Sequence, residues 1–104
     1  MRFLPTLLIP LLVSCESWRM ETDARSKCEK GLAIIQRVVG MKRDALNDAD
    51  RARTRAALTS GRDLIRDGLA IYAKAEVKTG KPCEVGQYIE GIKVARMLLM
   101  ELKD

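Results

Sequence analysis

Apolar and small residues recur at intervals of three and four along most of the chain, which is typical of amphipathic helices. After Thr22-Asp23, the first such stretch has an apolar face of Ala24, Cys28, Gly31, Ile35 and Val38, widened by Leu32, Ile34 and Val39. A second stretch, from about Asp48 to Lys78, has the apolar face Ala57, Gly61, Leu64, Ile65, Gly68, Ile71, Tyr72 and Ala75. A third, after Pro82, has the inward stripe Val85, Tyr88, Ile89, Ile92, Ala95, Leu99 and Leu102. The pattern therefore predicts three helices.

The residues between these stretches are typical of helix ends. Asn47-Asp48-Ala49-Asp50 fits a turn and N-cap, Gly80 fits the C-terminal position of the second helix, and Pro82 fits the first turn of the third. Ser60-Gly61 could mark a kink in the second helix or lie within a continuous one. Because short connections make successive helices antiparallel, we expect an all-α fold, a small antiparallel three-helix bundle over residues 23–104.

The first fifteen residues have a different pattern. Met1-Arg2 is a short basic start, and Phe3 to Val13 is an apolar run of eleven residues that contains Pro5 and Pro10. This run is shorter than the roughly 20 residues that a membrane-spanning helix needs, and its prolines argue against a lasting helix. A basic end, a short apolar core and a small residue are the features of a secretory signal peptide.

The segment Leu12-Val13-Ser14-Cys15 resembles the lipobox of bacterial lipoproteins. That resemblance implies removal of residues 1–14 and attachment of a diacylglycerol to the Cys15 sulfur, so that 15–22 form a lipidated tether. Glu16, where an Asp would favour the inner membrane, implies the outer membrane in a host that has one. An ordinary signal peptide with a chance cysteine is the alternative. Trp18 beyond the anchor would either contact the membrane surface or pack against the first helix.

Composition excludes several classes of enzyme. The 104 residues contain 19 Lys+Arg, 14 Asp+Glu and no histidine, so His-dependent triads and His-ligated metal sites are excluded. The length allows one small domain. No nucleophile lies in a pattern that would activate it, and no glycine-rich phosphate loop precedes a helix. We therefore expect a protein that is not an enzyme, with no catalytic residue, metal or cofactor.

Three cysteines minus the predicted lipidated one leave Cys28 and Cys83. In an exported, oxidising compartment an even remainder favours a disulfide. The antiparallel order of the predicted helices places both residues at the same end of the bundle. We therefore expect a disulfide between Cys28 and Cys83, with two free thiols or a metal-binding pair as the alternatives.

Two predicted surfaces are candidates for binding. Arg51, Arg55, Arg62 and Arg66 fall within about 60° of arc on one helix. This arrangement fits contact with a polyanion such as lipid phosphates, and it also fits an ordinary solvated face that Asp48 and Asp63 partly neutralise. The segment around Val94, Met97 and Leu98 is apolar nearly all round, and these three residues are expected to point away from the inward stripe. Exposed Met and Leu side chains suit an adaptable protein interface. The alternative is that the first helix, or a bent second helix, covers more of this face.

These features favour a membrane-anchored, non-enzymatic helical module of the cell envelope that binds a protein partner or a second copy, and no nucleic acid. In size, helicity and expected stapling it is similar to the helical pilotins of secretion systems, a likeness of architecture without a shared motif. The alternative is an envelope lipoprotein that binds polyanions through Arg51, Arg55, Arg62 and Arg66.

Overall fold

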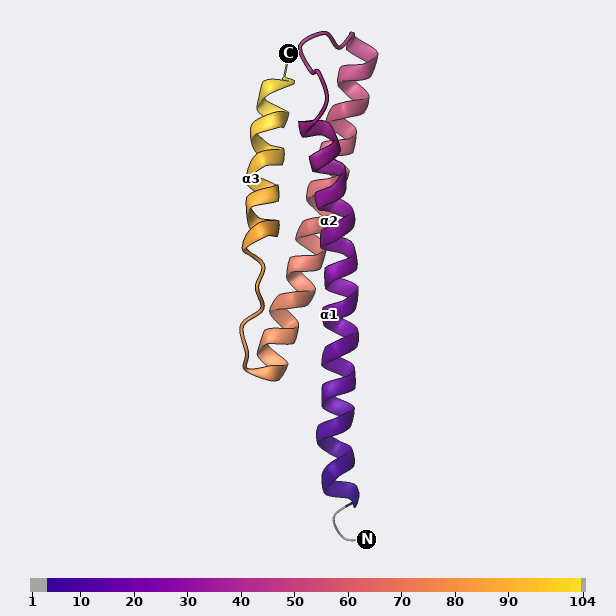
Figure 1. Cartoon of the computed structure of the whole chain (residues 1–104), viewed down its shortest axis with the longest axis vertical. Helices are drawn as coiled ribbons and strands as arrows, with labels where there is room; N and C mark the ends of the chain where they lie inside the picture. Colours follow the sequence, from indigo (N-terminus) through magenta and orange to yellow (C-terminus); the bar gives the residue numbers. More distant parts are fainter. Residues whose placement is uncertain (1–3, 104) are drawn as a thin grey trace.

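The computed structural model describes the backbone of residues 4–103 and the side chains of residues 18–103. Within residues 4–103 there are three helices and no strand: α1 (Leu4–Val39), α2 (Asp48–Thr79) and α3 (Gly86–Glu101). Figure 1 shows the three helices side by side, with each one antiparallel to its predecessor along the chain. The predicted all-α, three-helix fold is therefore confirmed.

The buried positions of all three helices follow one strict spacing. Alternating steps of three and four residues connect the buried residues of each helix, which is the heptad spacing of helices that pack side by side. These residues are Ala24, Cys28, Gly31, Ile35 and Val38 in α1; Thr54, Leu58, Gly61, Ile65, Gly68, Tyr72 and Ala75 in α2; and Tyr88, Gly91, Ala95, Leu98 and Leu102 in α3 and at its end. For α1 they are the central residues of the predicted face, whereas Val39, predicted at its margin, is 49% exposed.

In α2 and α3 the predicted faces need correction. Leu58, absent from the predicted face of α2, is completely buried. Leu98, expected to point outward from α3, is only 6% exposed, whereas Ile89, expected inside, is 43% exposed. In both helices, apolar residues also lie on either side of the buried positions. The sequence therefore shows an apolar arc wider than the buried face, and the positions of the neighbouring helices decide which part of that arc is buried.

Glycines bring α1 and α2 into close contact, and this pair has the most extensive interface of the bundle. A Cβ atom on Gly31 would overlap the carbonyl oxygen of Gly61, and one on Gly68 would overlap the Cys28 sulfur. α2 is continuous through Ser60-Gly61. Gly61 therefore serves the approach of two backbones and does not mark a kink.

The ends of α2 are as predicted. Asn47 adopts an extended conformation, with φ −74° and ψ 172°, and its side-chain oxygen accepts a hydrogen bond of 2.8 Å from the Asp50 backbone N–H. Gly80 ends the helix in the left-handed region, with φ 70°, and its N–H donates to the Glu76 carbonyl. Only glycine adopts this conformation at little cost.

α3 begins later than predicted. Pro82 and Cys83 lie in an irregular connection, and the helix starts at Gly86. The backbone N–H of Cys83 donates a 2.8 Å hydrogen bond to Glu76 Oε1. This contact holds the connection against the last turn of α2, a constraint between residues seven apart that no local pattern reveals.

α1 begins earlier than predicted, since its helical backbone runs from Leu4 past Pro5 and Pro10 without a break at residue 23. Pro5 falls in the first turn, where a backbone N–H has no helical partner. The expectation that the prolines would prevent a helix was therefore wrong. Figure 1 shows that the N-terminal part of α1 projects beyond the end of the α2–α3 hairpin. The basic start at Met1-Arg2 lies outside the described residues.

Candidate functional surfaces

The predicted disulfide does not form. Both Cys28 and Cys83 are free thiols. Cys28 is completely buried between α1 and α2, with its sulfur 3.7 Å from the Ile65 carbonyl oxygen. The Cys83 sulfur lies 4.0 Å from Glu21 Oε1, and Glu21 precedes Cys28 by seven residues, about 10 Å along a helix. The two cysteines are therefore at the same end of the bundle but too far apart to bond. The α2–α3 connection holds Cys83 beside Glu21, about two helical turns before Cys28 on α1.

The surroundings of both thiols favour the protonated form. Burial, with a smaller contribution from Glu29, raises the Cys28 pKa from its usual 9.0 to about 11. Burial, together with Glu21 and Glu76, raises the pKa of Cys83. Protonated thiols are poor nucleophiles and poor metal ligands. Among the described side chains, no group of three or more Cys, Asp or Glu residues could hold a metal ion.

The three residues of α3 that were predicted to bind a partner differ in their exposure to solvent. Leu98 is buried, Val94 is half-buried against the core, and Met97 is 69% exposed. Met100 and Ile89 are also exposed, at 72% and 43%. At 100° per residue, Ile89, Met97 and Met100 fall within about 80° on the outer side of the helix. We call these three residues the α3 outer stripe.

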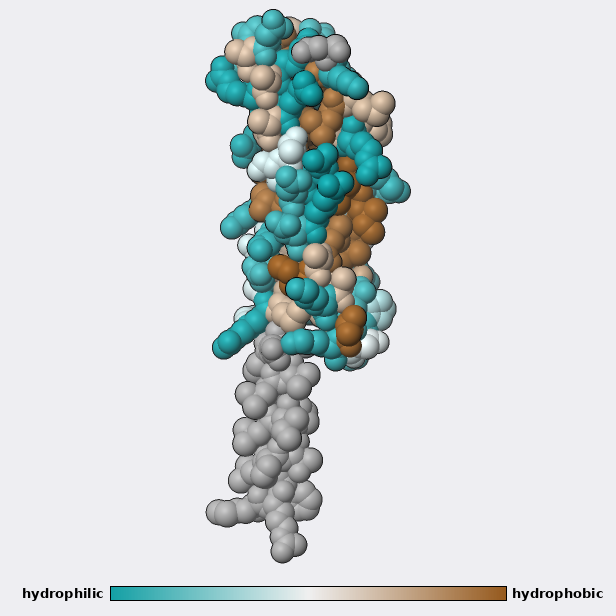
Figure 2. Space-filling view, turned by 180° about the vertical axis from the view of Figure 1, so that it is seen from behind, coloured by the Kyte–Doolittle hydropathy of each residue, from teal (hydrophilic) through white to brown (hydrophobic). Residues whose placement is uncertain are grey.

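The surroundings of the stripe are mixed. Lys93 falls within the same arc as the stripe. Its ammonium nitrogen lies 3.1 Å from Glu90 Oε1, and this ion pair directs the Lys93 side chain toward the edge of the stripe. Figure 2 shows a band of hydrophobic side chains among polar ones on the side of the molecule where α3 packs. Tyr88, Gly91, Ala95, Leu98 and Leu102 have the heptad spacing in the sequence, but apolar residues lie on both sides of them, so the spacing alone does not identify this set as the buried one.

The four predicted polyanion-binding arginines do lie on one helix, α2, but their environments differ. Arg55 and Arg66 are exposed, whereas Arg51 and Arg62 are half-buried, each with a buried Nε atom that forms no hydrogen bond. Arg62 Nε is 3.5 Å from Asp63 Oδ1, an ion pair without a hydrogen bond. Two of the four guanidinium groups are therefore only partly accessible to a ligand in solution.

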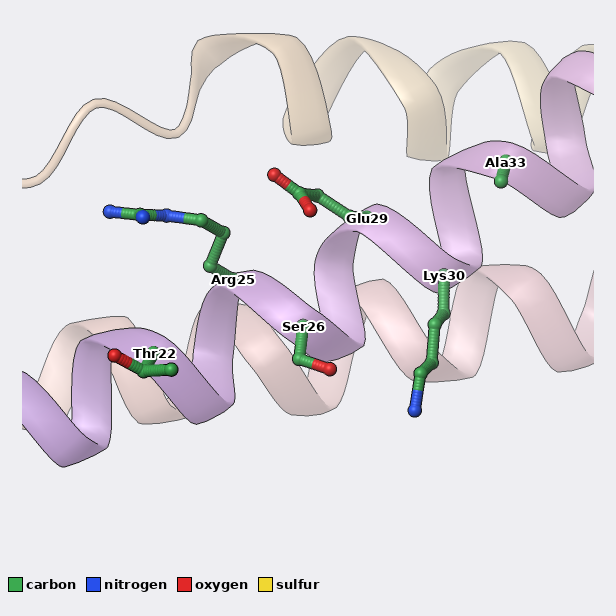
Figure 3. Close-up of a pocket in the computed structure, with 6 residues that line it drawn as sticks. All are labelled: Thr22, Arg25, Ser26, Glu29, Lys30 and Ala33. Carbon is green, nitrogen blue, oxygen red and sulfur yellow. The ribbon is translucent and has the colours of Figure 1, made fainter.

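A hollow of about 450 Å³ lies on the outer side of α1. Figure 3 shows that Arg25 and Glu29 extend toward α3, whereas Lys30 points the opposite way. All six of its lining residues come from this one helix: Thr22, Arg25, Ser26, Glu29, Lys30 and Ala33. Side chains that diverge from a single helix do not form a converging set of ligands, so the hollow is a feature of the surface.

A second hollow, of about 370 Å³, lies where α1 meets the α2–α3 connection. Its charged lining is Glu21, Arg25, Glu29 and Glu84. Tyr72 and Tyr88, also part of its lining, are stacked with ring centres 6.2 Å apart and are almost fully buried. Burial raises the Tyr72 pKa more than the hydrogen bond with Arg25 lowers it. The tyrosines therefore serve mainly as packing, with little ring surface left for a ligand.

The Cys15 side chain lies outside the described residues, although its backbone belongs to α1. Among the described residues, no helix combines the length and the apolar character needed to cross a bilayer. Comparison with protein-family models, curated proteins and solved structures finds no match for this chain.

Proposed function

We propose that the protein is a lipid-anchored, non-enzymatic adaptor of the cell envelope, similar in role to a pilotin. Acyl chains on Cys15 hold it at a membrane, and the α3 outer stripe binds an apolar helix of a partner protein. The observation that carries this proposal is the exposure of Met97 and Met100 on one side of a helix whose opposite side is buried. Clustered, flexible methionines fit the varied surfaces of partner helices.

The shape of α1 supports the anchor. Cleavage before Cys15 would remove residues 1–14, and this part of α1 projects beyond the hairpin formed by α2 and α3 (Figure 1). The core residues of α1 begin at Ala24, so the processed chain would retain the whole bundle. Two or three acyl chains, at about 0.8 kcal/mol per buried methylene, make such an anchor effectively permanent.

Site-specific photo-crosslinking in the native host tests the partner surface. A photoreactive residue replaces Met97 in one strain and Ser60, an exposed residue of α2, in the control strain. We expect a discrete adduct from position 97 that disappears when Met100→Lys is added, and no such adduct from position 60. An adduct of twice the chain mass would identify a second copy as the partner. Identical adducts from both positions, or none from position 97, would refute the proposal.

The polyanion alternative has support only from Arg55 and Arg66, the exposed pair. Binding through charges weakens steeply with ionic strength, whereas apolar docking does not. We expect the double variant Arg55→Glu/Arg66→Glu to retain the position 97 adduct at low and high salt. Loss of the adduct in this variant, together with loss at high salt, would favour the alternative.

A further inference from the structure

We propose that the end of the bundle formed by Trp18, Val77 and Lys81 rests on anionic phospholipid headgroups and holds the helices upright on the membrane. We call these three residues the membrane-facing end. The inference rests on the proposed lipid anchor at Cys15 and adds to it a protein surface, a lipid chemistry and an orientation.

The helix register places this end level with the anchor. The Gly61 backbone meets Gly31 and Ile34, and Gly68 meets Ala24 and Cys28. Since α1 and α2 are antiparallel, each step down α2 corresponds to a step toward the start of α1. Val77, nine residues beyond Gly68, is therefore level with about residue 17 of α1, next to Trp18 and about 3 Å along the axis from Cys15. The turn at Gly80 comes level with Cys15 itself.

The side chains at this level have the chemistry of a membrane interface. Val77 is 86% exposed and Trp18 is 66% exposed, and neither is used in the core. Arg19 and Lys81 beside them are exposed cations. Figure 2 shows isolated hydrophobic side chains among polar ones at this end of the described molecule. Tryptophan favours the headgroup region, and Lys and Arg near the surface attract anionic lipid.

Two of the acidic side chains described nearby contact Cys83 in the α2–α3 connection. Glu76 accepts the hydrogen bond from the Cys83 backbone, and Glu21 lies beside the Cys83 thiol. Glu84 is exposed and lines the hollow between α1 and the connection. Asp23 is exposed but lies five residues above Trp18, about 7 Å farther from the bilayer. Of the side chains that the structure describes, those nearest to the lipid are therefore mainly basic and apolar.

Contact at this end would orient the molecule. A single flexible anchor would let the bundle tilt freely, whereas Trp18 on α1 together with the α2–α3 turn provides support on two sides of the axis. The helices would then stand near the membrane normal, and the α3 outer stripe would face sideways, where a membrane-bound partner could reach it.

Fluorescence of Trp18, the only tryptophan of the chain, tests the inference. The acylated protein is reconstituted in phosphatidylcholine vesicles that contain phosphatidylglycerol. We expect brominated lipid to quench Trp18 strongly and aqueous iodide to quench it severalfold less than free N-acetyl-tryptophanamide. If iodide quenches both equally, the inference is wrong.

A matched pair of variants locates the contact. Val77→Glu/Lys81→Glu changes the membrane-facing end, and Val39→Glu/Lys42→Glu makes the same changes at the opposite end, where both residues are exposed. We expect the first variant to increase iodide quenching of Trp18 severalfold and the second to leave it unchanged. Equal effects of the two variants would overturn the inference.

Intact-mass spectrometry of the same preparation separates the two proposals. A Cys15 without acyl chains would overturn the anchor and the membrane-facing end together. An acylated Cys15 with an iodide-accessible Trp18 would overturn the membrane-facing end alone.

Discussion

At the scale of single residues, the absence of a side chain determines how closely the first two helices pack. Gly31, Gly61 and Gly68 lie where α1 and α2 meet, and each faces at least one backbone atom of the other helix, which cannot move aside as a flexible side chain can. Glycine within a helix costs about 1 kcal/mol relative to alanine. That cost is offset because the two backbones approach each other and the large side chains on either side are buried against them.

We expect Gly31→Ala to destabilise the fold by about 1–2 kcal/mol, because overpacking outweighs the gain in helix propensity. The added Cβ would lie 2.7 Å from Ile65 Cγ1 as well as overlapping the Gly61 carbonyl. Urea denaturation followed by circular dichroism measures the change. Gly86→Ala is the control, since a Cβ at Gly86 meets no atom within 4 Å. A Gly31→Ala variant as stable as this control would contradict the close approach.

The two free thiols should differ sharply in reactivity. Cys28 is completely buried with a pKa of about 11, so only about one thiol in a thousand is ionised at pH 8, and the reagent cannot reach it. We expect maleimide to label Cys83 in the folded protein and Cys28 only after unfolding, as seen by mass spectrometry of peptides. A protein that takes up no label without prior reduction would instead indicate the disulfide.

The raised pKa of Cys28 makes the stability of the fold depend on pH. The folded state holds the Cys28 proton more tightly than the unfolded chain, whose pKa is near 9.0. The stability that this group contributes is complete below pH 9 and is lost as the pH rises to about 11.

At the scale of elements, α3 shows how one turn of apolar residues divides between core and surface. Leu98 belongs to the buried seam, whereas its neighbour Met97 belongs to the α3 outer stripe. Both are large and apolar, so their hydropathy does not distinguish them. Their angular positions do, since consecutive residues point about 100° apart on a helix.

Leu98→Ala should therefore destabilise the protein by about 2–5 kcal/mol, the usual cost of a cavity left by leucine. Met97→Ala, its matched control, should change stability by less than about 0.5 kcal/mol, as for most surface substitutions. Thermal and urea unfolding of the two variants would show the difference. Similar losses of stability would mean that Met97 is covered and the stripe is smaller than described.

At the scale of the whole molecule, Arg43 connects the end of α1 to the end of α3. Its Nη1 atom donates to the carbonyl oxygens of Val38 and Val39 at 3.0 and 2.9 Å. Its Nε atom lies 3.2 Å from Glu101 Oε2. One half-buried guanidinium group thus satisfies the last carbonyls of one helix and pairs with the last turn of another.

We expect Arg43→Ala to cost about 1–3 kcal/mol, because charged hydrogen bonds and a favourable helix-end charge are lost together. Glu101→Gln should cost less than about 1 kcal/mol, since that ion pair is partly exposed and the contacts to α1 remain. Chemical denaturation gives both values. Equal losses in the two variants would show that the ion pair, and not the contacts to α1, carries the connection.

The sequence by itself determined the features that depend on neighbouring residues. These are three helices, the inward face of α1 and both ends of α2, because periodicity, the Asn47 cap and the Gly80 conformation act over a few residues. Only the tertiary structure decided that Leu98 is buried, that α3 starts at Gly86 and that Cys28 and Cys83 stay apart. Each of these depends on where a helix distant in the sequence lies. The sequence pattern does not give that position, because the apolar arc of each helix is wider than the part that becomes buried.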